Sequence, residues 1–143
     1  MSDDLVKWLG EQLDEDEGTA KAVQWDGSGN RLSWELAASA TVDVGEDEFY
    51  AGDRTIANHI VTHDPASVLR EIDAKRRVLA RHHAAPIPPG NEWAEEYPYC
   101  AAHAYTQADG TVVYPVQLQN CPELRDLAAP YADRPGYREE WRP

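Results

Sequence analysis

The chain has 143 residues, 42% of them hydrophobic, and a formal net charge of −13, a composition that suits a single globular domain rather than a disordered segment. No apolar run approaches the roughly 20 residues of a transmembrane helix, and the first residues lack the basic and apolar regions of a signal peptide. We therefore expect a cytoplasmic protein with no membrane segment, and the negative charge disfavours direct binding to nucleic-acid phosphates.

The first predicted element is an amphipathic helix over residues 2–23. Leu5, Leu9 and Leu13 recur at helical spacing and therefore share one face of this helix. Ser2 is the expected N-cap, because its hydroxyl can accept a hydrogen bond from a backbone N–H of the first turn. We expect the leucine face to be buried and the opposite, charged face to be solvated.

A small antiparallel sheet is predicted next. Two short stretches, Ala22–Trp25 and Arg31–Leu36, flank the turn sequence DGSGN, whose glycines and asparagine tolerate a positive φ. This pattern favours a β-hairpin, and the alternating stretch Ser39–Val44 is expected to add a third strand. The acidic segment Glu46–Asp53 is interpreted as a loop.

Two helices are predicted after this loop. A short helix over Asp53–Thr62 has to end before Pro65, because the residue preceding a proline avoids the helical conformation. A central helix follows over Asp64–His83, with Asp64 as its N-cap and Pro65 in the first helical position. We expect the rest of the chain to be organised around this helix. Its apolar stripe contains Val68, Leu69, Ile72, Leu79 and His83.

The central helix also carries a basic stripe of Arg70, Arg77 and Arg81. Residues 54–83 hold six basic and three acidic side chains, whereas residues 1–53 hold three basic and 14 acidic ones. Three interpretations stay open: the stripe is a solvated face, it docks on the acidic N-terminal segment, or it binds a partner protein.

The last third of the chain is expected to contain little regular structure. The Pro-rich stretch of residues 84–97 cannot continue the central helix and is interpreted as a linker. A strand is predicted over Thr111–Leu118, and one or two helical turns are predicted over Pro122–Ala129. The aromatic tail that follows is expected to pack onto the domain as an extended arm.

Together these elements predict an α+β fold in a single domain over residues 1–143. A helix–hairpin–helix core is expected over residues 1–83, built from the two amphipathic helices and the small antiparallel hairpin or meander. Residues 98–143 are expected to form a loop-rich C-terminal lobe beyond the linker.

The strongest chemical signal is the spacing Cys100-x2-His103-x17-Cys121. Two ligands three residues apart, followed by a third on a returning segment, are typical of structural zinc sites, which bind Cys and His in tetrahedral geometry. Four histidines of the helical half can supply the fourth ligand, namely His59, His63, His82 and His83. We favour His63, because the junction of two helices can fix its ring. Such a zinc ion would staple the C-terminal lobe to the central helix.

Other interpretations of the same residues stay open. Cys100 and Cys121 are alternatively buried free thiols accompanied by ordinary surface histidines, or they form a disulfide. His59 and His63 lie one helical turn apart, as in metalloproteases, but Ile60 stands where such enzymes carry the catalytic glutamate. No local motif supports a cysteine nucleophile.

Three stretches of the chain read DDLVKWLGEQLDEDE, HIVTHDPASVLREIDAKRRVL and CPELRDLAAPYADRPGYREEWRP. Together they resemble a domain of unknown function found in actinobacteria and their phages, and the resemblance covers most of the chain except residues 25–55 and the linker. The resemblance implies a Cys-x2-Cys pair followed by a later Cys-Pro. This chain has Cys100, His103 and Cys121 at those places, so one cysteine is replaced by histidine. The resemblance implies no activity.

We therefore expect a small acidic accessory protein that acts by binding another protein and uses a structural zinc site. One alternative is an acidic inhibitor that imitates nucleic acid and occupies a basic groove of its target. A second alternative is a metal-dependent enzyme, which would hold its zinc ion with three protein ligands and a water molecule.

Overall fold

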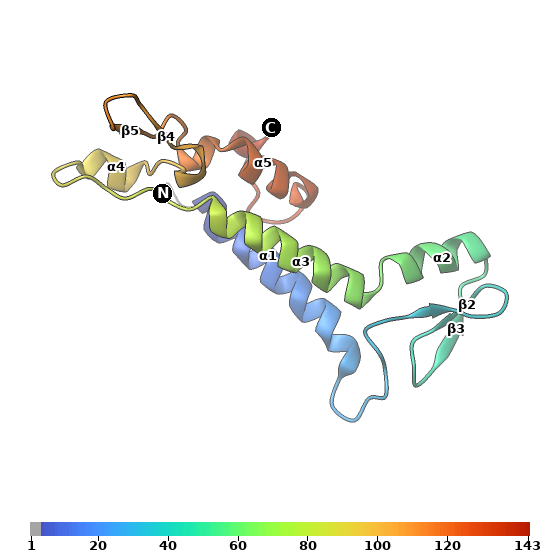
Figure 1. Ribbon diagram of the computed structural model, residues 1–143. Coiled ribbons are helices and arrows are strands. Elements are labelled where there is room, and N and C mark those ends of the chain that lie inside the picture. The colour runs from blue at the N-terminus through green and yellow to red at the C-terminus, as the bar shows by residue number, and fades with distance from the viewer. Residues whose placement is uncertain (1–3) are drawn as a thin grey trace. The chain divides into compact units, whose positions relative to one another are not determined.

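The computed structural model describes the chain from its fourth residue onward, and the chain divides into two compact units. The terminal unit comprises the chain up to Gln12 together with Lys75–Pro143, and the central unit comprises Leu13–Ala74. Both boundaries fall inside long helices, α1 (Asp4–Lys21) and α3 (Pro65–Arg81), so each unit contains one part of each helix (Figure 1).

Helix α1 has the buried face that its sequence predicts. Leu5, Leu9 and Leu13 are buried, and Ala20 is buried in the last turn. Burial of each leucine stabilises the folded chain by roughly 1.5–3 kcal/mol relative to leaving it exposed. The expected N-cap, Ser2, lies outside the described residues.

The central unit combines a three-stranded antiparallel sheet with helix α2. The strand order is β1-β2-β3, so β2 lies in the middle, and its Val42 is opposite Leu36 on one side and Phe49 on the other. Between the two long helices the elements are the 3-10 turn Ala22–Gln24, β1 (Glu35–Leu36), β2 (Thr41–Asp43), β3 (Glu48–Tyr50) and α2 (Arg54–Thr62).

Helix α2 packs on this sheet and completes the core of the central unit. Asp53 caps the helix, because its carboxylate accepts hydrogen bonds from the backbone N–H groups of Thr55 and Ile56. The buried centre of this core consists of Ala40, Val42 and Ala57. The helix predicted over residues 53–62 is therefore confirmed.

The predicted hairpin is wrong in its first strand, whereas the other two predicted strands, Arg31–Leu36 and Ser39–Val44, contain β1 and β2. Ala22–Trp25 is not a strand, since its first residues form a 3-10 turn, and the Val23 carbonyl accepts a hydrogen bond from the Asn30 side chain. The third strand is instead Glu48–Tyr50, within the segment that the sequence predicts as a loop. Gly45 makes the tight turn before this strand with a φ of +114°, and an added Cβ would lie 2.9 Å from a backbone oxygen.

Asp64 joins the start of α3 to the segment that precedes β1. One of its carboxylate oxygens accepts a hydrogen bond from the N–H of Ser67, as an N-cap does, and the other accepts one from the N–H of Trp34. Burial opposes ionisation of this carboxyl, but the two backbone hydrogen bonds outweigh burial and hold the pKa of Asp64 below its ordinary value. The predicted cap is therefore confirmed.

The terminal unit consists mainly of loops, short helical turns and a two-stranded sheet (Figure 1). Strands β4 and β5 pair antiparallel, with Tyr105 opposite Val113. After α3 the elements are α4 (Glu92–Glu96), β4 (Tyr105–Thr106), β5 (Val112–Val113) and α5 (Pro122–Ala128), with 3-10 turns at Ala101–His103, Leu118–Asn120, Ala129–Tyr131 and Glu139–Trp141.

Three segments of this unit differ from the prediction. The central helix ends two residues early, at Arg81, the linker contains helix α4, and the strand predicted over Thr111–Leu118 is reduced to Val112–Val113. Helix α4 forms because the side-chain oxygen of Asn91 caps it by accepting a hydrogen bond from a backbone N–H. Pro115 interrupts the predicted strand, since proline has no N–H for a sheet ladder.

The C-terminal tail packs against the first part of α1 within the terminal unit. The ring of Trp8 contacts the rings of Tyr137 and Trp141 at centroid separations of 5.7 and 5.4 Å, and its indole N–H donates to the Pro135 carbonyl. Gly136 has a φ of +89°, and an added Cβ would lie 2.7 Å from the Trp8 indole nitrogen, so only glycine fits there. The packing predicted for the tail is confirmed.

The fold class is α+β, as predicted. Helices account for most of the regular structure, and both sheets are small and antiparallel. Helix α1, with 18 residues, carries charged side chains such as Lys7, Glu11 and Asp14. Over the part of the chain that the structure describes, no helix combines the length and the apolar composition needed to cross a membrane.

We predict that Trp141→Ala lowers the free energy of unfolding by about 3–4 kcal/mol, because it leaves a cavity beside the ring of Trp8. The control is Trp25→Ala, since the Trp25 side chain is 60% exposed and its removal leaves no cavity. Chemical denaturation measures both values. Equal losses in the two variants would contradict a stabilising role of the packed tail.

We predict that Asp64→Ala lowers the free energy of unfolding by about 1–2 kcal/mol at neutral pH, because two backbone N–H groups lose their acceptor. The folded-state pKa of Asp64 is lowered, so its contribution is present above the ordinary carboxyl pKa of 3.8 and is lost as the pH falls through the folded pKa. Denaturation measured at decreasing pH should therefore show that the difference in the free energy of unfolding between Asp64→Ala and the wild type becomes smaller. The exposed Asp26 supplies the control Asp26→Ala, for which we expect the free energy of unfolding of the wild type at neutral pH.

Candidate metal centre

Four side chains of the terminal unit bring their donor atoms together. His82, Cys100, His103 and Cys121 each offer one atom, and these atoms all lie within 4.8 Å of one another. His82 and both cysteines are buried, whereas the His103 side chain is 24% exposed. The cluster is therefore shielded from water except on the side of His103.

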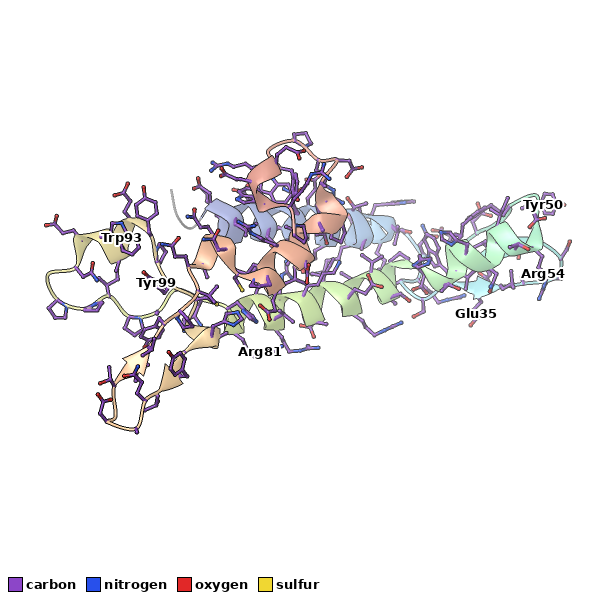
Figure 2. All side chains as sticks on the ribbon, turned by 90° about the horizontal axis from the view of Figure 1, so that it is seen from above. Glu35, Tyr50, Arg54, Arg81, Trp93 and Tyr99 are labelled. Atoms are coloured by element: carbon purple, nitrogen blue, oxygen red, sulfur yellow. The ribbon has the colours of Figure 1, made fainter. Side chains whose placement is uncertain are left out.

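Backbone contacts position the first two donors. His82 directly follows Arg81, the last residue of α3, which is labelled in Figure 2, and its N–H still donates to carbonyls of the last helical turn. Cys100 forms a β-bridge with Ala84, and its N–H donates to the Val116 carbonyl at 2.7 Å. The end of the helix and the segment around Cys100 are thereby held side by side.

Helical turns position the other two donors. His103 is the last residue of a 3-10 turn, and Cys121 occupies the N-cap position of α5, where Pro122 starts the helix. The N–H of Cys121 donates to the Leu118 carbonyl at 3.2 Å. Each of these donors therefore lies at the end of a helical turn, whose backbone is hydrogen-bonded.

The separations between the donors fit a tetrahedral ion. The Nδ1 of His82 lies 3.4 Å from the Sγ of Cys100 and 3.3 Å from the Sγ of Cys121, and the Nε2 of His103 lies 3.4 Å from the Sγ of Cys121. In a tetrahedral zinc site, ordinary Zn–S and Zn–N bond lengths place nitrogen and sulfur about 3.5 Å apart. These three nitrogen–sulfur separations are therefore the ones expected in a tetrahedral site with two sulfur and two nitrogen ligands.

Burial sets the protonation of two of these donors. Burial, together with the neighbouring Cys100, raises the pKa of the Cys121 thiol to about 12. Burial also lowers the pKa of His82, so its imidazole is neutral at pH 7. A metal ion that binds here must displace the thiol proton of Cys121, whereas His82 already has the protonation state of a ligand.

Glu123 lies beside the cluster in the first turn of α5, and no ligand spacing in the sequence pointed to it. Its carboxylate is 2.9 Å from the Nε2 of His103 and 3.4 Å from the Sγ of Cys121. Its own backbone N–H, the Cys121 thiol and the His103 ring hold the pKa of Glu123 below its ordinary value. The Nε2 of His103 can bond to only one partner, so its contact with Glu123 and its coordination to a metal exclude each other.

Three of the predicted ligands converge as their spacing indicates. Cys100, His103 and Cys121 are all members of the cluster. Both cysteines are free thiols, so the alternative of a disulfide is not realised in this structure. Both are also fully buried, and the two imidazoles aimed at their sulfur atoms distinguish the cluster from an ordinary pair of buried thiols.

The fourth member of the cluster is His82 rather than the favoured His63. His63 belongs to the central unit, where its ring centroid lies 4.5 Å from that of His59. A regular helix would place His83 on the apolar stripe, but α3 ends at Arg81, and the chain then turns so that His82 is buried and His83 is exposed. The Pro-rich stretch that follows was the signal for this earlier helix end.

The three arginines of the predicted basic stripe have exposed side chains. Arg70 belongs to the central unit and donates a hydrogen bond to the Ser67 hydroxyl at 3.0 Å. Arg77 and Arg81 belong to the terminal unit. Their binding to a partner stays a prediction.

We predict that the purified protein binds one metal ion per chain and that His82→Ala abolishes this binding, because the variant lacks one of four donors. The matched control is His83→Ala, which removes the neighbouring, exposed histidine. Elemental analysis after dialysis measures the metal content of each protein. Loss of metal in His63→Ala, with full retention in His82→Ala, would contradict the assignment.

Comparison with known proteins identifies a family for this chain. A family model described as a family of unknown function, DUF6221, matches residues 2–143. No curated protein and no solved structure matches the chain significantly. The expected resemblance to a family of unknown function is confirmed, and it extends over nearly the whole sequence. The chain therefore belongs to the family of unknown function DUF6221.

Proposed function

We propose that this chain is a small accessory protein that binds another protein and whose terminal unit is stabilised by a structural zinc ion. The observation that carries the proposal is the donor set of His82, Cys100, His103 and Cys121. Four protein side chains satisfy a tetrahedral ion completely, as in structural zinc sites, whereas catalytic zinc sites keep one position for water or substrate.

Zinc is the ion that best suits these donors. Thiolate and imidazole ligands favour zinc over magnesium and calcium, which prefer oxygen ligands. The donor separations of 3.3–3.4 Å fit a tetrahedron, whereas copper(II) prefers a tetragonal arrangement. The pairing of two sulfur with two nitrogen donors is common among structural zinc sites.

A structural role is supported by the composition of the terminal unit. Between Arg81 and α5 its regular elements are one five-residue helix, two strands of two residues each, and 3-10 turns. A zinc ion would tie the end of α3 to the segment around Cys100 and to the start of α5. Because such a site does not exist in the unfolded chain, the free energy of metal binding contributes directly to folding.

A protein partner is supported by exposed apolar side chains of the terminal unit. Ile87, Trp93, Tyr105 and Val112 have exposed fractions of 49, 49, 52 and 47%. All of them lie between the end of α3 and the start of α5, the region that the zinc ion would stabilise. Aromatic and large apolar residues gathered on one part of a surface are typical of protein interfaces.

The negative charge of the central unit supports a second candidate function, that of an acidic inhibitor that imitates nucleic acid. Leu13–Ala74 hold 14 acidic and four basic side chains, a net charge of −10 out of the −13 of the whole chain. Such a field attracts basic surfaces, and its effect is screened by salt. Association with a basic partner that does not weaken as salt rises would exclude this candidate. The enzyme alternative has less support, since the four donors leave no open coordination position.

We predict that cobalt(II) in place of zinc gives the intense visible bands of a tetrahedral site and a thiolate charge-transfer band, because two cysteines are among the donors. A weak, six-coordinate spectrum would contradict the proposal. Removal of zinc by a chelator should lower the melting temperature by roughly 10 °C or more, and added zinc should restore it. Cys100→Ser and Cys121→Ser should each abolish these bands, because each variant lacks one of the four donors.

A further inference from the structure

An apolar groove lies in the terminal unit, on segments that flank the metal centre. Its volume is about 300 Å³, and its walls come from the Pro-rich stretch after α3, from α4 and from the region of β5. The lining residues used below are Pro86, Pro88, Ala94, Tyr99, Val112 and Tyr114. Nearly all of these side chains are apolar or aromatic, so the groove suits a ligand with little polar surface at its centre.

Two aromatic side chains, Tyr99 and Tyr114, line this groove, and further aromatic rings adjoin them. The ring of Trp93 lies 5.8 Å from that of Tyr99 and 5.4 Å from that of Tyr97, measured between centroids. Figure 2 shows Trp93 and Tyr99 on neighbouring segments of this region. Tyr105 lies opposite Val113 in the two-stranded sheet. Such rings offer flat apolar faces together with indole N–H and phenol O–H donors.

The segment that forms the groove has acidic side chains and no Lys or Arg. Between Arg81 and Arg125 the chain has no Lys or Arg. The acidic residues of this interval are Glu92, Glu95, Glu96, Asp109 and Glu123. Three of them belong to α4, which contributes a wall of the groove, and their side chains are exposed. A cationic ligand is therefore attracted here, and an acidic one is repelled.

We propose that this groove binds an extended, proline-containing segment of a partner protein that carries Arg or Lys beside its prolines. A polyproline II segment has no internal hydrogen bonds and presents flat rings, so aromatic grooves with hydrogen-bond donors recognise it. Its basic side chains would pair with the carboxylates of α4 and stack on Trp93. The inference deepens the proposed protein-binding function and rests on it.

The groove is connected directly to the metal ligands. Tyr99 precedes Cys100, and its carbonyl accepts a hydrogen bond from the N–H of the groove residue Ala85 at 2.7 Å. Cys100 itself forms a β-bridge with Ala84, two residues after His82. A zinc ion held by His82 and Cys100 would fix both of these segments. We therefore expect the metal-free protein to bind the segment more weakly than the zinc-loaded protein.

The test uses the full chain, loaded with zinc, and a displayed library of random dodecapeptides. The enriched peptides should contain proline together with Arg or Lys, and a synthetic copy of the most enriched one is titrated by fluorescence anisotropy. Trp93→Ala should weaken its binding at least about tenfold. Trp25→Ala is the matched control, since it removes an exposed tryptophan of the central unit, and it should leave the affinity unchanged.

A second variant tests the charges without touching an apolar side chain. Glu92→Gln combined with Glu95→Gln should weaken binding of the same peptide about threefold and reduce its salt dependence. Both carboxylates are exposed, so we expect this variant to fold. It can therefore test the groove even if Trp93→Ala does not fold. Circular dichroism of each variant checks its folding.

Several outcomes would contradict the proposal that the groove binds a basic, proline-containing segment. These are a library that enriches no peptide, enrichment of peptides without proline or without basic residues, and full affinity in both folded variants. The zinc content of the same preparations shows which of the two proposals has failed, peptide binding in the groove or the structural zinc site. Protein that takes up no zinc when zinc is supplied, but still binds the peptides through Trp93, would refute the zinc site and support the groove. Protein that holds zinc but enriches no peptide would refute the groove alone.

Discussion

The convergence of His82, Cys100, His103 and Cys121 is the constraint on which the terminal unit depends. Seventeen residues separate the first donor from the second, and seventeen separate the third from the fourth. These connecting segments contain little regular structure, so bringing four donor atoms within 4.8 Å of one another costs considerable conformational entropy. Bonds to a metal ion are one way in which small, loop-rich proteins offset such a cost.

Packing of aromatic rings stabilises a different part of the same unit, the C-terminal tail. The rings of Trp8, Tyr137 and Trp141 hold the tail on α1, and they lie outside the segment that carries the four donors. This arrangement suits a binding surface, because a metal ion held by the four donors would fix the backbone from inside while aromatic side chains such as Trp93 stay exposed. A segment without such an internal tie would tend to bury its own aromatic rings instead.

Helices α1, α2 and α3 could be predicted from the sequence because their signals are local: apolar side chains at helical spacing and, for α3, the cap Asp64. The third strand of the sheet could not be predicted in this way, because the segment Glu48–Tyr50 becomes a strand only by pairing with β2. Spacing likewise indicated three of the four donors. The fourth depended on where α3 ends, because a helix that continued would have turned His83 rather than His82 toward the apolar side.

All four donors lie on one continuous stretch of the chain that contains no Lys or Arg. Arg81 and Arg125 are the nearest trypsin cleavage sites on either side, so a complete digest leaves every donor on the single peptide His82–Arg125. That peptide also contains both cysteines of the protein. Its mass alone therefore reports whether the thiols are reduced, alkylated or joined to each other, and one fragment is enough to follow the chemical state of the whole centre.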